Sequence, residues 1–301
     1  MITVNNIYKS YNNGTINAVQ DLSFEIKEGE IFGLIGPDGA GKTTLFRILT
    51  TLLLADKGTA TINGHDVVTD YKKIRNEVGY MPGKFSLYQD LSIEENLQFF
   101  ATIFNTTLKE NYDLIKDIYV QIEPFKKRYA GQLSGGMKQK LALCCALIHK
   151  PVVLFLDEPT TGVDAVSRKE FWDMLLRLKM QGITIMVSTP YMDEANLCDR
   201  IALMQKGKIL GINSPTNVAN SFPLKLYGVK TSYAYKVMTE LRNMPETNTC
   251  FAFGDSLHVT FKKNIDTNTL INTLKLKGYN DVEINEAIPG IEDEFIHLLK
   301  S

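Results

Sequence analysis

The segment from Glu30 to Thr44 constrains the fold most, because it joins an apolar run to a helical pattern through a glycine-rich turn. The letters EIFGLI at 30–35 predict a buried strand. The turn reads GPDGAGKT at 36–43 and fits the pattern G-x-x-x-x-G-K-[ST]. A buried strand before such a turn and a helix after it predict an α/β fold with a phosphate-binding loop.

The residues of this loop suit a bound triphosphate. Glycines let backbone N–H groups converge on phosphate oxygens. We expect Lys42 to neutralise the β- and γ-phosphates and the Thr43 hydroxyl to hold Mg²⁺. Asp38 adds a negative charge near the loop, and its carboxylate is expected to point to solvent. A strand–turn–helix with chance glycines is the alternative that this context disfavours.

A second continuous apolar run, VVLFL at 152–156, leads directly into Asp157 and Glu158. A run of this kind places the two carboxylates at the C-terminal edge of a sheet, where α/β proteins bind ligands. Asp157 can hold Mg²⁺ through water, and Glu158 can orient or deprotonate an attacking water. The alternative is a pair of surface carboxylates at a strand end.

The run LSGGM at 133–137 indicates how a triphosphate is used. Two glycines after a serine, opening a helix, form a bare patch of N–H groups at a positive helix end. Such a patch can hold a phosphate without a deep pocket of its own. It suits a surface that closes onto a nucleotide held by another subunit.

Composition narrows the class of protein. The chain has 301 residues and is 44% hydrophobic, which is enough to form a hydrophobic core. Its net charge of −1 gives no reason to expect nucleic-acid binding, which usually requires a basic surface. Its four cysteines show neither metal-ligand nor disulfide spacing, which favours a reducing cytoplasm. Charges interrupt the first 30 residues, so we expect no signal peptide. No apolar run approaches the roughly 20 residues of a membrane helix, so another subunit is expected to provide any membrane anchor.

The chain is expected to contain two domains. Residues 92–130 read as mostly helical, beginning with a capping box of Ser92 and Glu95, and predict a helical subdomain at about 84–135. The composition changes at Ser214-Pro215, and the order strand–helix–strand–strand–helix–strand after it predicts a small ferredoxin-like α/β domain. We therefore predict domains 1–214 and 215–301. Further helices are expected at 45–54, 136–149, 170–179, 235–242 and 269–277, and strands at 183–188, 201–204, 224–229, 250–253, 257–261 and 282–284.

The ordered glycine loop, LSGGM and LFLDEP make residues 1–215 resemble the ATP-binding subunit of an ABC transporter. By this resemblance the signature Ser134, Gly135 and Gly136 contacts the γ-phosphate of the opposite subunit's ATP. Tyr11 takes the place of the aromatic that stacks on adenine, with a core or edge-strand tyrosine as the alternative. Asp164 matches the loop that crosses the dimer interface. The C-terminal letters EDEFIH at 292–297 resemble those of ATPases paired with ABC-2-type export permeases.

The resemblance implies an ATP-hydrolysing subunit, peripheral on the cytoplasmic face of the cell membrane, that powers an exporter when an ATPase dimer closes on a separate permease. Its ligands would be ATP and Mg²⁺, and its partners a permease and a second, identical or different, ATPase subunit, with no nucleic acid. Permease contact is expected at 92–130 and near Gly83. The catalytic residue would be Glu158, the metal residues Thr43 and Asp157, and the nucleotide-binding residues Tyr11, Gly36, Pro37, Asp38, Gly39, Ala40, Gly41, Lys42, Thr43, Thr44, Ser134, Gly135 and Gly136.

Two positions depart from the family pattern. Gly83 stands where the family has a glutamine after Tyr-x-Pro, and Pro190 stands where it has a histidine after Ser-Thr. A positioned side chain that handles a proton typically contributes about 10²–10⁴-fold to the reaction rate. Loss of the glutamine and the histidine should therefore lower ATP hydrolysis more than ATP binding. One interpretation is an ATPase that tolerates both losses. The alternative is a partly degenerate, slowly or non-hydrolysing regulatory subunit whose signature completes a partner's site. An ABC ATPase of translation or DNA repair is disfavoured, because the chain has one glycine loop and no sustained heptads.

Overall fold

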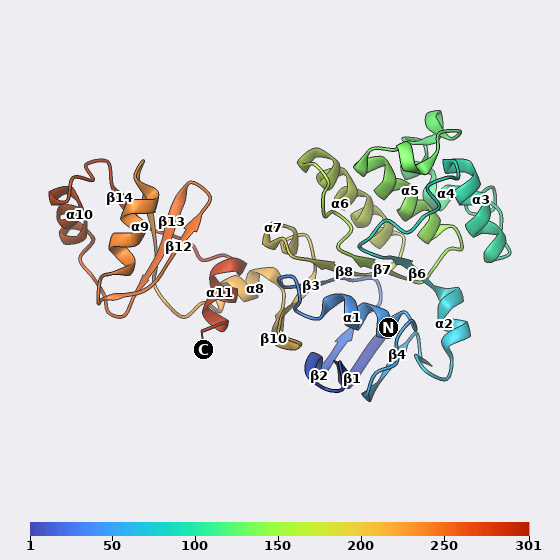
Figure 1. Cartoon of the computed structure of the whole chain (residues 1–301), viewed down its shortest axis with the longest axis horizontal. Coiled ribbons are helices and arrows are strands. Elements are labelled where there is room, and N and C mark those ends of the chain that lie inside the picture. The colour runs from blue at the N-terminus through green and yellow to red at the C-terminus, as the bar shows by residue number, and fades with distance from the viewer. Residues whose placement is uncertain (301) are drawn as a thin grey trace. The chain divides into compact units, whose positions relative to one another are not determined.

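The computed structural model describes residues 1–300, which form two compact units that divide between Pro215 and Thr216 (Figure 1). Each unit has its own hydrophobic cluster. Among residues 1–300, no helix combines the length and the apolar character that crossing a membrane requires.

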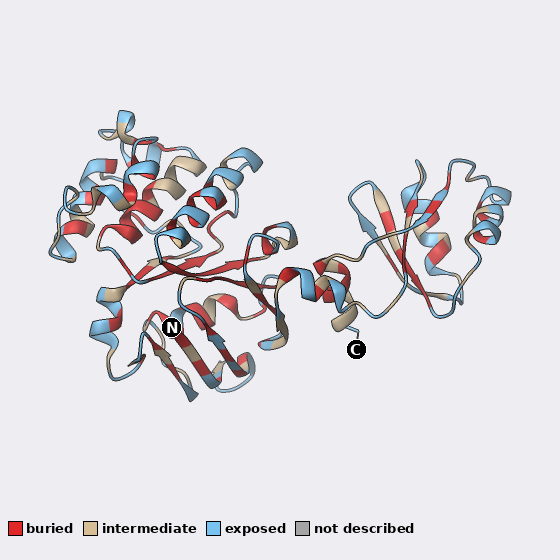
Figure 2. Ribbon diagram, turned by 180° about the vertical axis from the view of Figure 1, so that it is seen from behind, coloured by how far each residue is buried: buried red, intermediate tan, exposed pale blue. Residues whose placement is uncertain are grey.

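The first unit is built around a six-stranded sheet with the order β10-β9-β3-β8-β7-β6. Neighbouring strands from β9 to β6 run parallel, and only β10 is antiparallel to its neighbour. Every residue of β3 and β7 is buried, as expected for parallel strands covered on both faces (Figure 2). The strands are β3 (Ile31–Ile35), β6 (Val78–Met81), β7 (Val153–Asp157), β8 (Thr184–Thr189), β9 (Arg200–Gln205) and β10 (Lys208–Asn213).

A second, antiparallel sheet with the order β2-β1-β4-β5 packs with the first around helix α1. Phe24 and Phe32, one from each sheet, stack with ring centroids 5.4 Å apart, and Phe46 of α1 meets Phe155 of β7 edge-on. These aromatic contacts fix the strand that precedes the phosphate loop and the helix that follows it. The elements are β1 (Ile2–Tyr11), β2 (Ile16–Ile26), α1 (Lys42–Leu49), β4 (Lys57–Ile62) and β5 (His65–Asp66).

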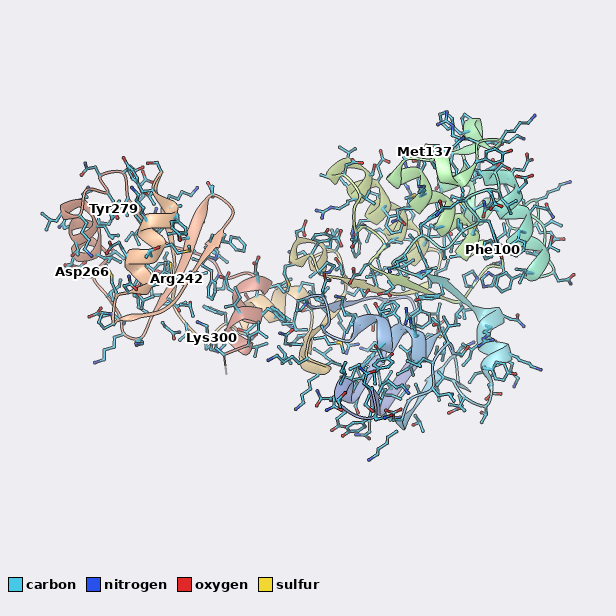
Figure 3. All side chains as sticks on the ribbon, viewed as in Figure 1. Phe100, Met137, Arg242, Asp266, Tyr279 and Lys300 are labelled. Atoms are coloured by element: carbon cyan, nitrogen blue, oxygen red, sulfur yellow. The ribbon has the colours of Figure 1, made fainter. Side chains whose placement is uncertain are left out.

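Helices α3, α4 and α5 gather on one side of the six-stranded sheet; Phe100 of α3 and Met137 of α5 are labelled in Figure 3. The predicted capping box is confirmed: Ser92 Oγ accepts from Glu95 N–H at 3.2 Å, and Glu95 Oε2 accepts from Ser92 N–H at 2.7 Å. The helices of this unit besides α1 are α2 (Tyr71–Glu77), α3 (Ile93–Ile103), α4 (Tyr112–Tyr119), α5 (Gly135–Leu147), α6 (Ala165–Met180) and α7 (Met192–Ala195), with 3₁₀ turns at Glu123–Phe125 and Ala130–Gln132. Helix α8 (Pro215–Asn220) begins where the two units divide.

The second unit has the predicted ferredoxin-like order, with an antiparallel sheet β12-β13-β11-β14. Val229, Val259 and Leu241 lie in its core together with residues of both α9 and α10. The elements are β11 (Leu226–Lys230), α9 (Ala234–Arg242), β12 (Thr247–Phe253), β13 (Ser256–Phe261), α10 (Thr267–Leu276), β14 (Glu283–Glu286) and α11 (Ile291–Leu298).

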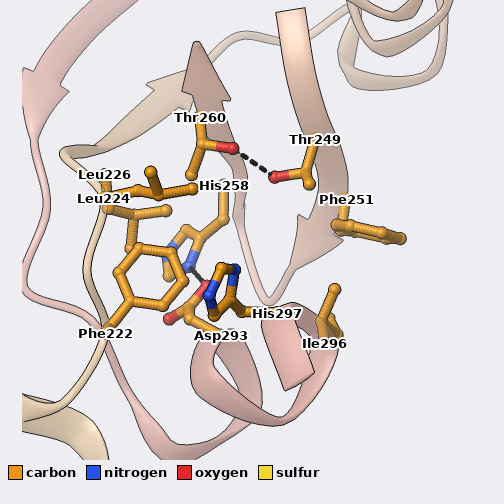
Figure 4. A pocket seen from close by; sticks show the side chains of 10 residues that line it. All are labelled: Phe222, Leu224, Leu226, Thr249, Phe251, His258, Thr260, Asp293, Ile296 and His297. Atoms are coloured by element: carbon orange, nitrogen blue, oxygen red, sulfur yellow. Dashed lines mark hydrogen bonds and ion pairs between the residues drawn. The ribbon is translucent and has the colours of Figure 1, made fainter. Parts of the chain in front are cut away.

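Helix α11 is tied to the face of this sheet opposite the core. His258 alternates with core residues of β13, and its Nδ1 lies 2.8 Å from Asp293 Oδ1 on α11 (Figure 4). The other carboxylate oxygen of Asp293 accepts from Gly290 N–H at 2.8 Å, so one side chain both caps α11 and anchors it. His297 meets Phe222 edge-on, with ring centroids 5.7 Å apart.

Several element boundaries differ from the predicted ones. The helix expected at 45–54 begins at Lys42, directly after the glycine turn. It ends at Leu49, just before Thr51 adopts a left-handed conformation with φ 63°. The helix expected at 170–179 begins at Ala165, because the exposed Asp164 caps it. Strands β4, β5, β6 and β10 and helices α2, α7, α8 and α11 were not predicted at all.

Candidate nucleotide-binding site

The phosphate loop leaves the C-terminal end of β3 and closes at Gly41, the N-cap of α1. Gly41 has φ 107°, and a Cβ there would lie 2.1 Å from the carbonyl oxygen of Ala18. Both the backbone angle and the lack of space require glycine. The loop therefore runs directly into the first turn of α1, with Pro37, Asp38 and Gly39 exposed.

Lys42 lies at the centre of the site, with its side chain only 3% exposed. Its Nζ donates to the carbonyl oxygens of Gly36 at 2.8 Å and Pro37 at 3.1 Å. The same ammonium forms an ion pair with Glu158 Oε1 at 3.0 Å. The structure thus brings together the predicted phosphate-binding cation and the predicted catalytic carboxylate.

Asp157 ends β7 and is 2% exposed. Burial raises the pKa of Asp157, while hydrogen bonds from the Ser188 and Thr43 hydroxyls act in the opposite direction. Ser188 Oγ donates to Asp157 Oδ1 at 2.7 Å. The two predicted metal residues, Thr43 and Asp157, therefore lie side by side.

Glu158 has φ 52°, a left-handed conformation that is uncommon for a residue with a side chain. Its N–H is held by the carbonyl oxygen of Ser188 at 3.1 Å and by the Ser188 hydroxyl at 3.0 Å. This turn directs the half-buried carboxylate towards Lys42.

Tyr11 ends β1 beside the first turn of α1, where its Oη lies 3.3 Å from Thr44 Oγ1. The ring is half-buried. This position next to the phosphate loop is compatible with the predicted contact to a base, which stays a prediction.

The LSGGM run opens α5 as predicted. Ser134 is the N-cap, and its Oγ accepts from Met137 N–H at 3.4 Å. Gly135 is exposed, and Gly136 packs so closely on α6 that a Cβ would lie 2.8 Å from Ser167 Oγ. The backbone patch is thus open to solvent at the start of the helix.

Asp164 performs a local role in this structure. Its Oδ1 accepts from the N–H groups of Val166 at 3.1 Å and Ser167 at 3.0 Å. The backbone hydrogen bond from Ser167 is the largest of the contacts that lower the pKa of Asp164. The residue is exposed, so it remains accessible to a partner chain.

The two departures from the family pattern follow β6 and β8, the strands on either side of β7. Gly83 lies so close to the end of β7 that a Cβ would be 2.9 Å from the carbonyl oxygen of Asp157. Pro190 follows Thr189, the last residue of β8. Glycine has no side chain, and proline has an apolar side chain and no backbone N–H. Neither position therefore offers a polar side chain to the site.

Sequence reasoning missed a buried network behind the site. Glu194 of α7 is 3% exposed and accepts from Thr160 Oγ1 at 2.7 Å and from Thr189 Oγ1 at 2.6 Å. Arg168 lies on its outer side, with Nε 3.9 Å from Glu194 Oε1. Glu194 thereby links the segment after β7 to the end of β8. An acidic residue in a short helix gives no sequence signal for such a role.

A groove of about 470 Å³ separates the helical side from the sheet. Phe100, Ile103 and Phe104 line it from the helical side, and Pro82 lines it near Gly83. Leu52 and Ile103 are 59% and 58% exposed. Exposed apolar side chains gathered in one groove are typical of a protein interface.

Together, the glycine loop, the buried lysine and the two carboxylates at the edge of a parallel sheet define a nucleoside-triphosphate-binding protein of the P-loop class. A family model described as ABC transporter matches residues 19–161. The chain is 32% identical over 304 residues to Nod factor export ATP-binding protein I of Burkholderia orbicola (strain AU 1054), covering 99% of this chain and 96% of that protein. The chain therefore belongs to the family of ABC transporter ATP-binding proteins.

Two further comparisons agree. The chain is 36% identical over 304 residues to the probable multidrug ABC transporter ATP-binding protein YbhF of Escherichia coli (strain K12), covering 99% of this chain and 52% of that protein. The chain thus spans about half the length of that relative. The dimeric ATP-binding cassette MJ0796, in a post-hydrolysis state bound to ADP and Pi, matches with a TM-score of 0.64 and 25% identity, over 71% of this chain and 98% of that one.

Proposed function

We propose that this chain binds and hydrolyses ATP to power an ABC exporter whose membrane permease is a separate protein. Residues 1–214 would form the ATPase domain, with a helical subdomain at about 84–135, and residues 215–301 an accessory domain. Peripheral attachment to the cytoplasmic face of the membrane, through the permease, follows from this role. Export is favoured because relatives carry names such as multidrug and Nod factor export proteins.

One observation carries the proposal: Lys42 Nζ and Glu158 Oε1 lie 3.0 Å apart at the phosphate loop. When the triphosphate enters, its oxygens replace the loop carbonyls and the carboxylate as partners of Lys42. Glu158 is then free to orient or deprotonate the water that attacks the γ-phosphate. The glycine-rich backbone from Gly36 to Thr44 surrounds the phosphates, and Tyr11 stacks on adenine.

The residues present fit a magnesium ion bound with the nucleotide. Thr43 and Asp157 supply hard oxygen donors, which Mg²⁺ prefers, and the Thr43 hydroxyl is close enough to lower the pKa of Asp157. Mg²⁺ in nucleotide sites is usually held by one or two protein side chains together with phosphates and water, so these two residues would suffice on the protein side. When bound, the ion would neutralise charge on the β- and γ-phosphates.

Two exposed surfaces support the proposed partners. The open N–H patch at Ser134, Gly135 and Gly136 would complete the site of a second ATPase subunit, identical or different. The groove lined by Pro82 and Ile103 would receive an apolar segment of the permease, close to the loop that carries Gly83. No nucleic acid is expected to bind.

The test is phosphate release by the purified chain with saturating ATP. Glu158→Gln should lower kcat by about 10²–10⁴-fold while ATP still binds, because the general base alone is lost. Lys42→Ala should lose ATP binding itself. Glu25→Gln, which changes an exposed carboxylate of β2, is the matched control and should behave as wild type. Equal rates for wild type and Glu158→Gln would contradict the proposal.

The degenerate alternative has a specific observation in its favour, since Gly83 and Pro190 leave the site without two polar side chains. In that case the chain would pair with a non-identical ATPase, hold its own ATP and complete the partner's site through its signature. Single-turnover cleavage separates the two ideas. Fast and equal cleavage at both sites of a homodimer would exclude the degenerate alternative.

A further inference from the structure

Ser188 contacts both carboxylate residues of the site through one hydroxyl group. The hydroxyl donates to Asp157 Oδ1 at 2.7 Å and accepts from Glu158 N–H at 3.0 Å. Ser188 is fully buried, so water does not compete for these bonds. β7 and β8 pair in register at Asp157 and Ser188, which places the hydroxyl beside both groups.

The conformation of Glu158 needs such support. A non-glycine residue with φ near 50° is disfavoured and persists only when its surroundings hold it. The Ser188 hydroxyl and carbonyl are the two acceptors for the Glu158 N–H. The hydroxyl also donates to one oxygen of Asp157, so the same oxygen atom contributes to the position of both carboxylate residues.

Few other groups can compensate for lost positioning in this chain. Position 83 has no side chain, and position 190 is a proline. The orientation of the attacking water therefore depends on the position of the Glu158 carboxylate. A misplacement of about 1 Å in such a group can cost roughly 10²-fold in rate.

We propose that Ser188 is a positioning residue for ATP hydrolysis, which holds the left-handed turn at Glu158 and orients Asp157. This inference rests on the proposed ATPase function. Ser188 itself does not touch the nucleotide in this role. Its loss should therefore lower kcat and leave the affinity for ATP nearly unchanged.

The test compares Ser188→Thr with Ser188→Val, two side chains of the same shape of which only threonine keeps the hydroxyl. Ser188→Val should lose about 10²-fold in kcat, whereas Ser188→Thr should stay within about 10-fold of wild type. The Kd of a non-hydrolysable ATP analogue and the Tm should match between the two. Threonine and valine are both larger than serine, so a third variant, Ser188→Ala, removes the hydroxyl without adding volume. It should show the same loss of kcat as Ser188→Val.

Thr184→Val is the matched control, because it removes another buried hydroxyl of β8, one that accepts from Gly29 N–H at 2.9 Å. It should keep kcat. Equal kcat for Ser188→Thr and Ser188→Val, or a loss explained by a lower Tm or weaker ATP binding, would overturn the inference. Failure of the proposed function looks different: wild type and Glu158→Gln would then release phosphate at the same rate.

Discussion

Replacing Glu194 by alanine should destabilise the first unit strongly. Its carboxylate accepts from the hydroxyls of Thr160 and Thr189, which are 1% and 0% exposed. Alanine leaves both hydroxyl donors without a partner, at about 1–3 kcal/mol each, so the expected cost is about 2–6 kcal/mol. Glu194→Gln keeps one acceptor oxygen, and its cost should be nearer 1–2 kcal/mol.

The chain offers a built-in probe for this measurement. Trp172 is its single tryptophan and lies in α6 of the first unit, 2% exposed. Its fluorescence during urea unfolding reports the stability of that unit, and a constant m-value shows that only stability has changed. Glu25→Gln serves as the control for loss of an exposed carboxylate and should fall within about 0.5 kcal/mol of wild type.

A mutant cycle isolates the hydrogen bonds from the cavity that alanine leaves. In a Thr160→Val, Thr189→Val background no hydroxyl donor remains, so Glu194→Ala should cost less there than in wild type. A cost of less than about 1 kcal/mol for Glu194→Ala, the net contribution of one ordinary hydrogen bond, would show that the two hydroxyls do not need this carboxylate. An equal cost in both backgrounds would show the same.

Two further predictions concern packing and pH. Gly79→Ala should destabilise the first unit by about 1–3 kcal/mol, because the added Cβ would lie 2.3 Å from the carbonyl oxygen of Ala146 in α5. Gly211→Ala is the control: its Cβ would meet no atom within 4 Å, so it should be nearly neutral. Unfolding followed by Trp172 fluorescence measures both. Hydrogen bonds from Lys9 and the Ser10 backbone lower the pKa of Asp56 from 3.8 to about 2. A carboxyl group whose pKa is depressed in the folded state stabilises the fold above pH 3.8, and this stabilisation is lost as the pH falls to about 2. In an acid titration the free energy of unfolding should therefore fall less for Asp56→Asn than for wild type, and equal falls would contradict this expectation.

The contiguous parts of the site could be predicted from sequence. The turn at 36–43 and the pair Asp157-Glu158 are continuous in the chain, and their glycines and carboxylates have few alternative uses. The order of elements after residue 224 similarly predicted the ferredoxin-like unit, which the structure confirms. Such features can be predicted because all the residues that define them are neighbours in the sequence.

Other features depend on residues brought together by the fold. Ser188 contacts Asp157 only because β7 and β8 pair at that register. Glu194 joins two threonines that lie 34 and 5 residues away in the chain. The left-handed turn at Glu158 could not be predicted either, since glutamate rarely adopts it. Strand β4 buries only Ala60 and Ile62, and β5 has only two residues, so neither gives a strand pattern of useful length. The contact between Asp293 of α11 and His258 joins residues far apart in the chain.

Gly83 also limits how this sequence can change. A Cβ at that position would lie 2.9 Å from the carbonyl oxygen of Asp157, a backbone atom that cannot swing aside. Return of the family's glutamine therefore requires a second change that first moves the loop away from β7. A single substitution at position 83 therefore meets a steric barrier, and only paired changes at position 83 and in the neighbouring loop can bring a side chain to this place.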